Sequence, residues 1–277
     1  MNIRKNFLNS KFYNFEDMNF TWHNNPVFKL KTDVPENKIF LGLTDDSLIF
    51  LNSLKLDDSE LNPDLLIFAS RHTSETGRPA FLVHTTGNWS TEADFGGDPR
   101  ELSKTSALLQ KAAVFSFAEQ EFPTQLKNFS LDIEVTHHGP TNLEKPLIFM
   151  ELGSSEVEWI MNNAGELITK SIITTIFKYL ECRERRIGNI GLGFGGTHYA
   201  PNFHRLIKNK DVAMSFICPK YYIQQLDEEL INKMINNTLE KVDYFIIDWK
   251  GTNSDDKKYL IPLLENFKIP IRKTKEF

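Results

Sequence analysis

The stretch IGNIGLGFGGTHYAP, residues 187–201, carries the pattern that decides the fold. Residues 187–194 predict a buried strand, a Gly-Gly pair then breaks it, and Pro201 suits the first turn of a short helix through Leu206. The alternation continues downstream, with strands expected at 212–217, 244–247 and 269–271 and helices at 227–239 and 255–267. Strands that alternate with helices in this way indicate βαβ units and a largely parallel sheet.

Further apolar runs precede this stretch. They predict strands at 65–69, 80–84, 130–136 and 146–152 and helices at 101–119 and 155–180. Ser155 and Glu158 form a capping-box pattern at the start of the second helix, and Gly165 marks a candidate break within it. Residues 39–51 resemble a hairpin. The sequence therefore predicts one domain over residues 1–277, with an α/β fold in which a mixed, largely parallel sheet is flanked by helices.

The composition is that of an ordinary globular protein, with 40% hydrophobic and 25% charged residues. A net charge of −5 argues against sequence-independent coating of nucleic acid or anionic membrane, although it leaves room for a local basic footprint. Cys182 and Cys218 lack a CxxC spacing, which argues against a disulfide framework and fits the reducing cytosol. No run approaches the ~18 apolar residues of a membrane helix, so a cytoplasmic protein is expected.

Histidines occur at or near the ends of the expected strands. Five of the seven histidines have this position, namely His72, His84, His137, His138 and His198. Because sheet topology gathers strand ends around one crevice, we expect these side chains to meet there. The densest group is EVTHHGPT, residues 134–141, in which Glu134, Thr136 and two adjacent imidazoles run into a Gly-Pro turn.

Two mechanisms fit these residue types. In the first, histidines bind zinc together with Glu134 and Glu151, and the metal lowers the pKa of a bound water toward ~7. In the second, a histidine acts as a general base on water, and backbone amides of the glycine loops stabilise the oxyanion. No HExxH or G-x-S-x-G spacing is present, so both a standard metal site and a serine triad are weakly supported. The hydroxyls available for a triad are those of Ser70, Ser74 and Thr141.

The glycine-rich segment at 191–196 superficially resembles a nucleotide-binding loop. It is not a G-x-G-x-x-G pattern followed at once by a helix, so a turn that lets the backbone approach a substrate phosphate or ester is favoured. Another strand ends at Asp248-Trp249-Lys250-Gly251, where Lys250 is either a phosphate contact or a solvated lysine.

Five short motifs occur in a fixed order along the chain. They are SRHTSE (70–75), HTTGN (84–88), EVTHHGPT (134–141), ELGS (151–154) and GGTHYAP (195–201), and further similarity lies in Gly96-Gly97, Pro219-Lys220-Tyr221 and Asp248–Gly251. Together they resemble the D-aminoacyl-tRNA deacylase family of the archaeal and plant type. The similarity runs from roughly residue 40 to the end of the chain.

This resemblance implies a hydrolase that cleaves the ester between a D-amino acid and the 3′ end of tRNA, so that mischarged tRNA is recycled. It also implies zinc dependence and a domain similar to purine nucleoside phosphorylase and peptidyl-tRNA hydrolase. The water-activating residues are then expected to be His84, Glu134, His137, His138 and His198. The expected metal ligands are His72, His84, Glu134, His137 and Glu151. Which histidine is the base and which is a ligand stays open.

Two departures from the family pattern leave alternatives open. Members of the family carry a Gly-His-Ile pattern before the Pro-Lys-Tyr segment, whereas Phe216 stands here at the histidine's position. The family also opens with a short strand before an Asn-Ile pair, whereas this chain begins at Asn2-Ile3, which predicts that a strand is missing. The alternatives are a metal-dependent amidohydrolase or nucleoside-processing hydrolase, and a tRNA-binding homologue that has lost activity.

Overall fold

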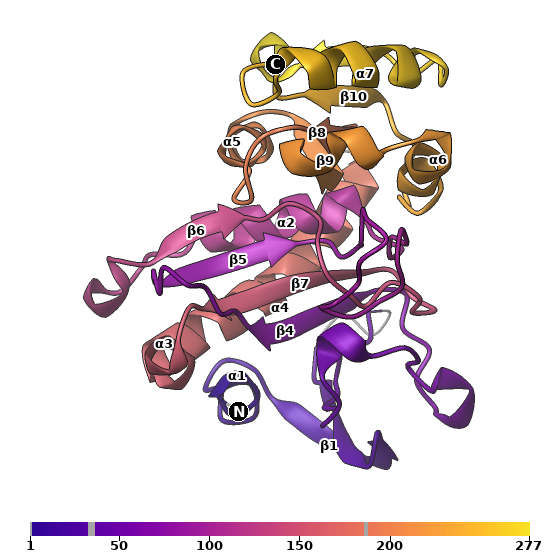
Figure 1. The fold of residues 1–277 in the computed structure, drawn as a ribbon. Coiled ribbons are helices and arrows are strands. Elements are labelled where there is room, and N and C mark those ends of the chain that lie inside the picture. Colours follow the sequence, from indigo (N-terminus) through magenta and orange to yellow (C-terminus); the bar gives the residue numbers. More distant parts are fainter. Residues whose placement is uncertain (1, 33–36, 186–187) are drawn as a thin grey trace.

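The computed structural model describes residues 2–32, 37–185 and 188–277, and Figure 1 shows its elements. The helices are α1 (Asn2–Leu8), α2 (Ala107–Ala118), α3 (Glu156–Ile160), α4 (Asn162–Arg185), α5 (Pro201–Asn209), α6 (Glu228–Asn236) and α7 (Ser254–Glu265). The strands are β1 (Phe15–Trp22), β2 (Asn25–Leu30), β3 (Phe40–Leu41), β4 (Leu66–Arg71), β5 (Ala80–His84), β6 (Ser130–Ile133), β7 (Leu147–Gly153), β8 (Asn189–Phe194), β9 (Val212–Cys218), β10 (Tyr244–Ile247) and β11 (Ile271–Lys273). Within these ranges no helix has both the length and the apolar character that a membrane span requires.

The described strands form three hydrogen-bonded sheets. The C-terminal sheet has the order β11-β10-β8-β9 and is entirely parallel. The central sheet has the order β4-β7-β5-β6, in which β5 and β7 pair antiparallel and the other two pairs are parallel. A small antiparallel sheet, β1-β2-β3, lies at the N-terminal end. The α/β class, with mixed and largely parallel strands flanked by helices, is confirmed.

The two larger sheets meet where the chain leaves β6. Beyond Ile133, Val135 N donates to the carbonyl of His198 (2.9 Å), and Thr136 N donates to the carbonyl of Ile217 in β9 (3.0 Å). Residues 134–136 therefore link the end of one sheet to the edge strand of the other. The expected strand at 130–136 is accordingly too long: β6 ends at Ile133, and residues 134–136 form this link.

Helix α2 packs between the two larger sheets and α4. It begins where Ser106 accepts a hydrogen bond from Leu109 N and not at Glu101, the start of the expected helix. Its Lys111 is buried, and its ammonium donates to the carbonyls of Ile207 (3.3 Å), Lys210 (2.8 Å) and Val212 (2.9 Å). This contact ties α2 to the connection between α5 and β9.

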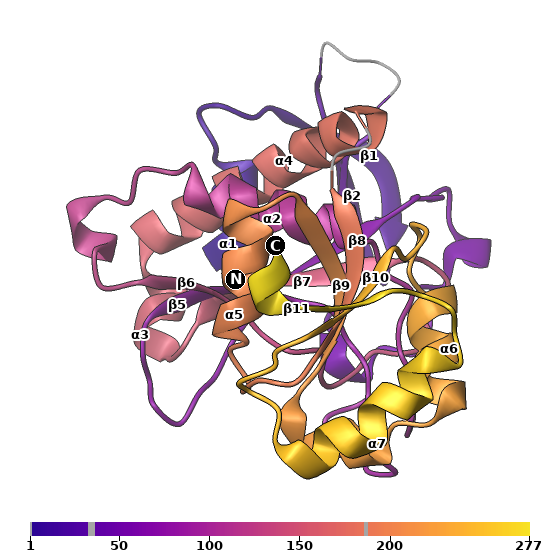
Figure 2. The same ribbon diagram turned by 90° about the horizontal axis from the view of Figure 1, so that it is seen from above.

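A second apolar core lies on the other face of the parallel sheet. Figure 2 shows α6 and α7 on one side of β8, β9 and β10, and α2 on the other. Side chains of β8 and β10, including Phe194 and Phe245, pack there with Leu230 of α6 and Leu264 of α7. Both faces of the parallel sheet are therefore covered, as the near-continuous apolar sequence of its strands requires.

Several local predictions are confirmed and others are wrong. Strands 80–84 and 244–247 have the expected bounds, and the capping box of Ser155 and Glu158 is present. The long helix breaks at Met161, not at Gly165. The hairpin at 39–51 is wrong, because β3 pairs with β2 and residues Leu48–Phe50 form a 3-10 turn, η1. Residue 187 of the expected strand lies outside the described residues.

Candidate active site

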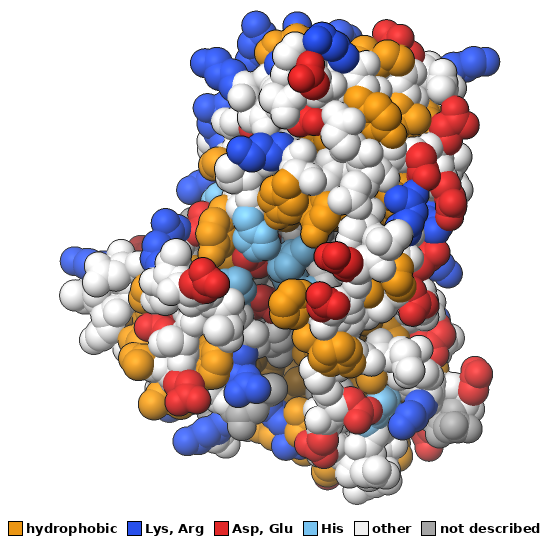
Figure 3. Space-filling model, viewed as in Figure 1, with side chains coloured by type: hydrophobic (Ala, Val, Ile, Leu, Met, Phe, Trp, Pro, Cys, Tyr) orange, Lys and Arg blue, Asp and Glu red, His pale blue; other side chains and the backbone are white. Residues whose placement is uncertain are grey.

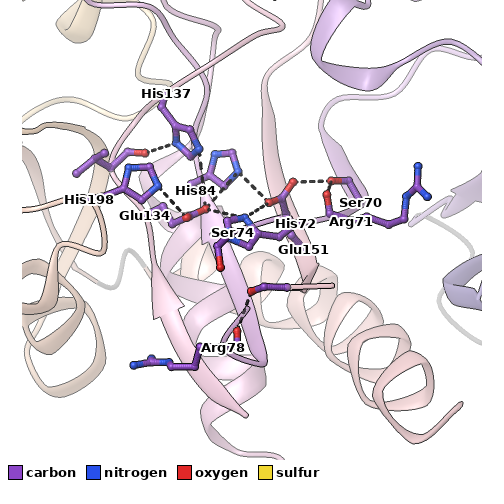
Figure 4. Close-up of polar contacts among 12 residues, drawn as sticks. Ser70, Arg71, His72, Ser74, Arg78, His84, Glu134, His137, Glu151 and His198 are labelled. Atoms are coloured by element: carbon purple, nitrogen blue, oxygen red, sulfur yellow. Dashed lines mark hydrogen bonds and ion pairs between the residues drawn. The ribbon is translucent and has the colours of Figure 1, made fainter. Parts of the chain in front are cut away.

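The structure brings all seven predicted site residues to one crevice. Figure 4 shows six of them, and the ring of the seventh, His138, lies beside those of His84 and His137. His72 directly follows β4, His84 is the last residue of β5, and His198 follows β8. The segment after β6 contributes Glu134, His137 and His138. Glu151 lies within β7, where it pairs in register with Ser70 of β4 and Leu82 of β5. Five different strands thus deliver side chains to one place, because their ends or centres meet at the junction of the two sheets.

Glu134 lies at the centre of this group and is 1% exposed. Its Oε1 accepts a hydrogen bond from His198 Nε2 at 2.9 Å. Its Oε2 forms no hydrogen bond with any residue that the structure describes, but lies 3.7 Å from His72 Nδ1, 4.0 Å from His84 Nε2 and 4.0 Å from His137 Nε2. One buried carboxylate therefore faces four imidazoles.

Glu151 is the second buried carboxylate. Its Oε1 accepts from Ser70 Oγ at 2.5 Å, and its Oε2 accepts from His72 Nδ1 at 3.3 Å. Burial alone raises its pKa, but the hydrogen bond from His72 and the nearby imidazole of His84, whose Nε2 lies 3.7 Å from Oε2, outweigh burial, so the pKa of Glu151 is held well below its usual range. Burial conversely lowers the pKa of His72 and of His84, but the two carboxylates outweigh it, and both pKa values are raised.

Three of the imidazoles share one hydrogen-bond arrangement. Nδ1 of His84 bonds the carbonyl of Thr85 (3.1 Å), Nδ1 of His137 that of Val135 (2.8 Å), and Nδ1 of His138 that of Gly139 (2.6 Å). A carbonyl can only accept, so each Nδ1 carries the proton and each Nε2 keeps its lone pair. Their ring centroids lie 4.4–4.8 Å apart.

The pKa values of these three rings shift in different directions: that of His84 is raised, whereas those of His137 and His138 are lowered. Burial, followed by repulsion from His138, His84 and His198, holds the pKa of His137 well below its ordinary value. Burial and the charge of His84 lower the pKa of His138 to about 4. His137 and His138 are therefore neutral near pH 7, which is the form of imidazole that binds a metal ion.

The turn that carries His137 and His138 is held from several sides. Gly139 N donates to the carbonyl of Phe95 (3.1 Å), and Gly87 N donates to the carbonyl of His138 (2.8 Å). The indole of buried Trp89 donates to the carbonyl of Thr136 (2.7 Å). Trp89 therefore acts as an anchor for this segment.

The donor set fits a metal ion. Single ligand atoms of His84, His137 and His138 lie within 4.8 Å of one another, as do those of the set Glu134, His137 and His198 and of the set His72, Glu134 and Glu151. Among the described residues, His72 Nε2, His84 Nε2 and Glu134 Oε2 are buried and find no hydrogen-bond partner. Buried polar atoms are normally satisfied, so orphaned lone pairs that face one crevice mark the position of a missing partner.

A serine triad is not formed. Ser70 Oγ donates to Glu151, Ser74 Oγ bonds Thr76 Oγ1 at 3.1 Å, and Thr141 Oγ1 accepts from Asp98 N at 2.8 Å. None of these three hydroxyls is hydrogen-bonded to a histidine among the described residues. The Oγ of Ser70 instead helps to fix the orientation of Glu151.

Tyr221 was missed by sequence reasoning as a site residue. Its hydroxyl lies 3.5 Å from His198 Nδ1, and its ring is 52% exposed beside the crevice. The signal was the Pro219-Lys220-Tyr221 motif, but nothing in the sequence placed that motif against His198.

Phe216 does not line the crevice. It is fully buried in the apolar core beneath α6 and α7. The next side chain of β9, that of Ile217, faces the other way and packs in the core that contains α2 and the central sheet. The backbone of β9 bonds the crevice segment, because the carbonyl of Ser215 accepts from Thr85 Oγ1 (3.0 Å) and Ile217 N donates to Thr136 Oγ1 (3.0 Å). The substitution therefore leaves the histidine and carboxylate cluster complete.

The crevice opens to the surface, and Figure 3 shows its histidines exposed between hydrophobic side chains. It forms one end of a cavity of about 1630 Å³ that is also lined by Asn88, Phe95 and Glu151. A substrate can therefore reach the buried carboxylates from solvent.

Comparison with known proteins gives consistent results. The D-aminoacyl-tRNA deacylase family model matches residues 59–272. A D-aminoacyl-tRNA deacylase of Thermococcus onnurineus is 33% identical over 268 residues, which cover 96% of this chain and 92% of the relative. One of Methanocaldococcus jannaschii is 37% identical over 231 residues, which cover 80% of this chain and 86% of the relative. A crystal structure of a conserved protein of unknown function, AF0625, aligns with a TM-score of 0.81 at 31% identity and covers 99% of this chain and 91% of that chain.

The tight packing around Gly139 generates a stability prediction. A Cβ at this position would lie 2.3 Å from Gly97 N, 2.3 Å from Ile49 O and 2.4 Å from Gly96 C, all of them backbone atoms. Backbone atoms cannot move aside locally, so we expect Gly139→Ala to lower the free energy of unfolding in urea by about 3 kcal/mol. Gly77→Ala is the control, because Gly77 has φ +59° but free space around a Cβ, and its cost should be about 1 kcal/mol. Equal stabilities of the two variants would contradict the packing argument.

Proposed function

The chain belongs to the D-aminoacyl-tRNA deacylase family, and we propose that it hydrolyses the ester between a D-amino acid and the 3′ end of tRNA in the crevice around Glu134. The observation that carries this proposal is the convergence of five histidines and two buried carboxylates inside the region that the family model matches. The amidohydrolase, the nucleoside-processing hydrolase and the inactive tRNA-binding homologue are not favoured, since the relatives described above are deacylases and the cluster is complete. The location we propose is the cytoplasm, where charged tRNA is used.

The reaction asks little covalent chemistry of the protein. An aminoacyl ester is already activated, so a positioned water, a base for its proton and a donor for the developing oxyanion suffice. The attacking water loses a proton, the ester C–O bond breaks, and the terminal ribose oxygen leaves with a proton. This agrees with the absence of a histidine-bonded hydroxyl at Ser70, Ser74 or Thr141.

We assign the role of general base to His198. Its Nε2–H donates to Glu134 Oε1, which fixes the tautomer and leaves Nδ1 as the acceptor on the side of Tyr221. The ring is partly exposed, so a water can reach it from the crevice. A buried carboxylate that orients an imidazole and stabilises its protonated form is the arrangement that general-base histidines use in other hydrolases.

Zinc is the metal we propose for this site, with Nε2 of His84, His137 and His138 as its ligands. The lone pairs of His137 and His138 are free because each Nδ1 donates to a backbone carbonyl, which is the usual outer contact of a metal-binding histidine. His84 has the same backbone contact, and because Glu151 and Glu134 raise its pKa, it would release its Nε2 proton when the ion binds. When bound, the ion supplies Lewis-acid polarisation of an ester oxygen or a water of lowered pKa. His72, Glu134 and Glu151, three of the ligands expected from sequence, would then orient the site and supply negative charge beside it.

The first prediction concerns the reaction itself. We expect the purified protein to release D-tyrosine from D-tyrosyl-tRNA and to leave L-tyrosyl-tRNA intact under the same conditions. The measurement is the acid-precipitable radioactivity that remains on tRNA with time, with buffer alone as the control. Absence of release from the D form, both with and without added zinc, would refute the enzymatic function.

The second prediction concerns the metal. The triple variant His84→Ala/His137→Ala/His138→Ala should lose the zinc that the native protein retains after dialysis, because it lacks all three proposed ligands. Elemental analysis measures the metal directly and does not depend on activity. His204→Ala, which changes a histidine of α5 away from the crevice, should keep its zinc. Native zinc content in the triple variant would place the ion elsewhere.

The third prediction concerns the base. His198→Gln should lower kcat by about 10²- to 10⁴-fold, because water then loses its proton acceptor. Its zinc content should equal that of the native protein, which separates loss of the base from loss of the metal. His204→Gln is the matched control. A kcat within threefold of the native value would rule out His198 as the base.

A further inference from the structure

A small open cavity of about 370 Å³ lies next to the crevice, at the carboxyl edge of the parallel sheet. Its lining is Lys220, Tyr221, Lys250, Gly251, Asn253 and Asp256. Lys220 lies two residues after the end of β9, and Lys250 three residues after the end of β10. In open α/β sheets this edge, where neighbouring strands end together, is the usual place for a ligand.

The ammonium groups of the two lysines are available to a ligand. Both side chains are exposed, and within the described ranges neither ammonium takes part in an ion pair or a hydrogen bond. Asp256 is the acidic residue of the cavity, and both of its carboxylate oxygens accept hydrogen bonds from neighbouring side chains. Gln224 donates to Oδ1 (2.8 Å) and Asn253 donates to Oδ2 (2.6 Å). The cavity therefore offers two free cations to an anionic ligand.

Backbone contacts join this cavity to the base. Lys220 N donates to the carbonyl of Gly196, and Gly196 N donates to the carbonyl of Gly251, both at 3.1 Å. Gly196 precedes His198 by two residues, and Tyr221 contacts His198 Nδ1 through its hydroxyl. The loops that carry Lys220, Lys250 and His198 are therefore hydrogen-bonded to one another.

The opposite side of the crevice has the reverse charge. Glu92 and Asp94 are exposed beside Phe95 on the rim of the larger cavity, and within the described ranges neither carboxylate has an ion pair. Figure 3 shows acidic side chains directly to the right of the histidine patch, a further acidic side chain to its left, and basic side chains above it and farther to the left. The 3′ end of an aminoacyl-tRNA has the complementary polarity, since its phosphodiesters are anionic and its α-ammonium group is cationic.

We propose that Lys220 and Lys250 form a subsite for the phosphodiester that precedes the terminal nucleotide of the tRNA. The RNA strand then enters over the ends of β9 and β10, the ester lies beside His198, and the α-ammonium group points toward Glu92 and Asp94. This inference rests on the proposed function, because it assumes that the same crevice holds the ester. Lysine at such a place contributes charge to phosphate binding without reading the base.

The test compares two esters of the same amino acid. D-tyrosyl-tRNA carries the phosphodiester, whereas D-tyrosyl-adenosine has the same ester and no phosphate. For Lys220→Ala/Lys250→Ala we expect the ratio of kcat/KM for the tRNA to kcat/KM for the adenosine ester to fall about tenfold, and the salt dependence of KM for tRNA to become shallower by a slope of about 1. The conservative pair Lys220→Arg/Lys250→Arg should restore the ratio.

The matched control is Lys210→Ala/Lys241→Ala. These exposed lysines precede the same two strands, so the variant removes the same charge from the opposite edge of the sheet. It should leave the ratio at the native value. An unchanged ratio in the Lys220 and Lys250 variant, or an equal fall in the control, would overturn the subsite.

Binding of uncharged tRNA, measured by fluorescence anisotropy, separates this inference from the proposed function. If the native protein released no D-tyrosine, the deacylase proposal would fail. Weaker tRNA binding by the Lys220 and Lys250 variant, with native binding by the control, would still support the phosphate contact. Equal binding by all three proteins would overturn the contact whatever the hydrolysis assay gave.

Discussion

Three consecutive backbone hydrogen bonds at residues 134–136 hold the molecule and its crevice together. Glu134 N donates to the carbonyl of Val83 in β5. Val135 N donates to the carbonyl of His198 in the loop after β8, and Thr136 N donates to that of Ile217 in β9. The first bond belongs to the central sheet, and the other two cross to the parallel sheet. Because strand side chains alternate, a shift of one residue here would turn Glu134 out of the crevice and Val135 into it. The position of the central carboxylate therefore follows from how the two sheets are joined.

This junction explains how two carboxylates can be buried without large cost. An isolated buried carboxylate is strongly disfavoured, but Glu151 has hydrogen bonds from Ser70 and His72, and Glu134 has one from His198. Negative charge from the pair raises the pKa of His72 and His84, while His137 and His138 stay neutral. Within the same cluster, the carboxylates thus favour the protonated form of His72 and His84, while burial favours the neutral form of His137 and His138. The division matches a site that needs lone pairs for a metal ion and positive charge beside its carboxylates.

The sequence predicted the local elements and the meeting of the histidines, and its failures have physical causes. Ala80–His84 and Tyr244–Ile247 are short apolar runs with clear ends, so their bounds could be read directly. The predicted hairpin at 39–51 is wrong because its first half pairs with β2 and its second half forms a 3-10 turn. That outcome depends on contacts with other segments of the chain and not on the local residues. The contact of Tyr221 with His198 and the inward burial of Phe216 likewise depend on which face of a strand or turn meets the junction. The residue types alone indicated the chemistry of the site. The tautomers of its histidines could be assigned only from the positions of the backbone carbonyls that they contact.

The distribution of charge bears on how an acidic protein handles tRNA. With a net charge of −5, long-range attraction to the RNA as a whole is absent, and screening limits the reach of any surface charge to about 8 Å at physiological salt. Attraction must then come from a few cations placed where the strand passes. Lys220 adjoins Tyr221, which contacts His198, and Lys250 adjoins Gly251, whose carbonyl accepts from Gly196 N. If the protein contacts the tRNA only at its 3′ end, most of the binding free energy comes from the acylated terminus. The body of the tRNA, which is the same whichever enantiomer it carries, then contributes little, so the crevice that contacts the amino acid decides which tRNA is held.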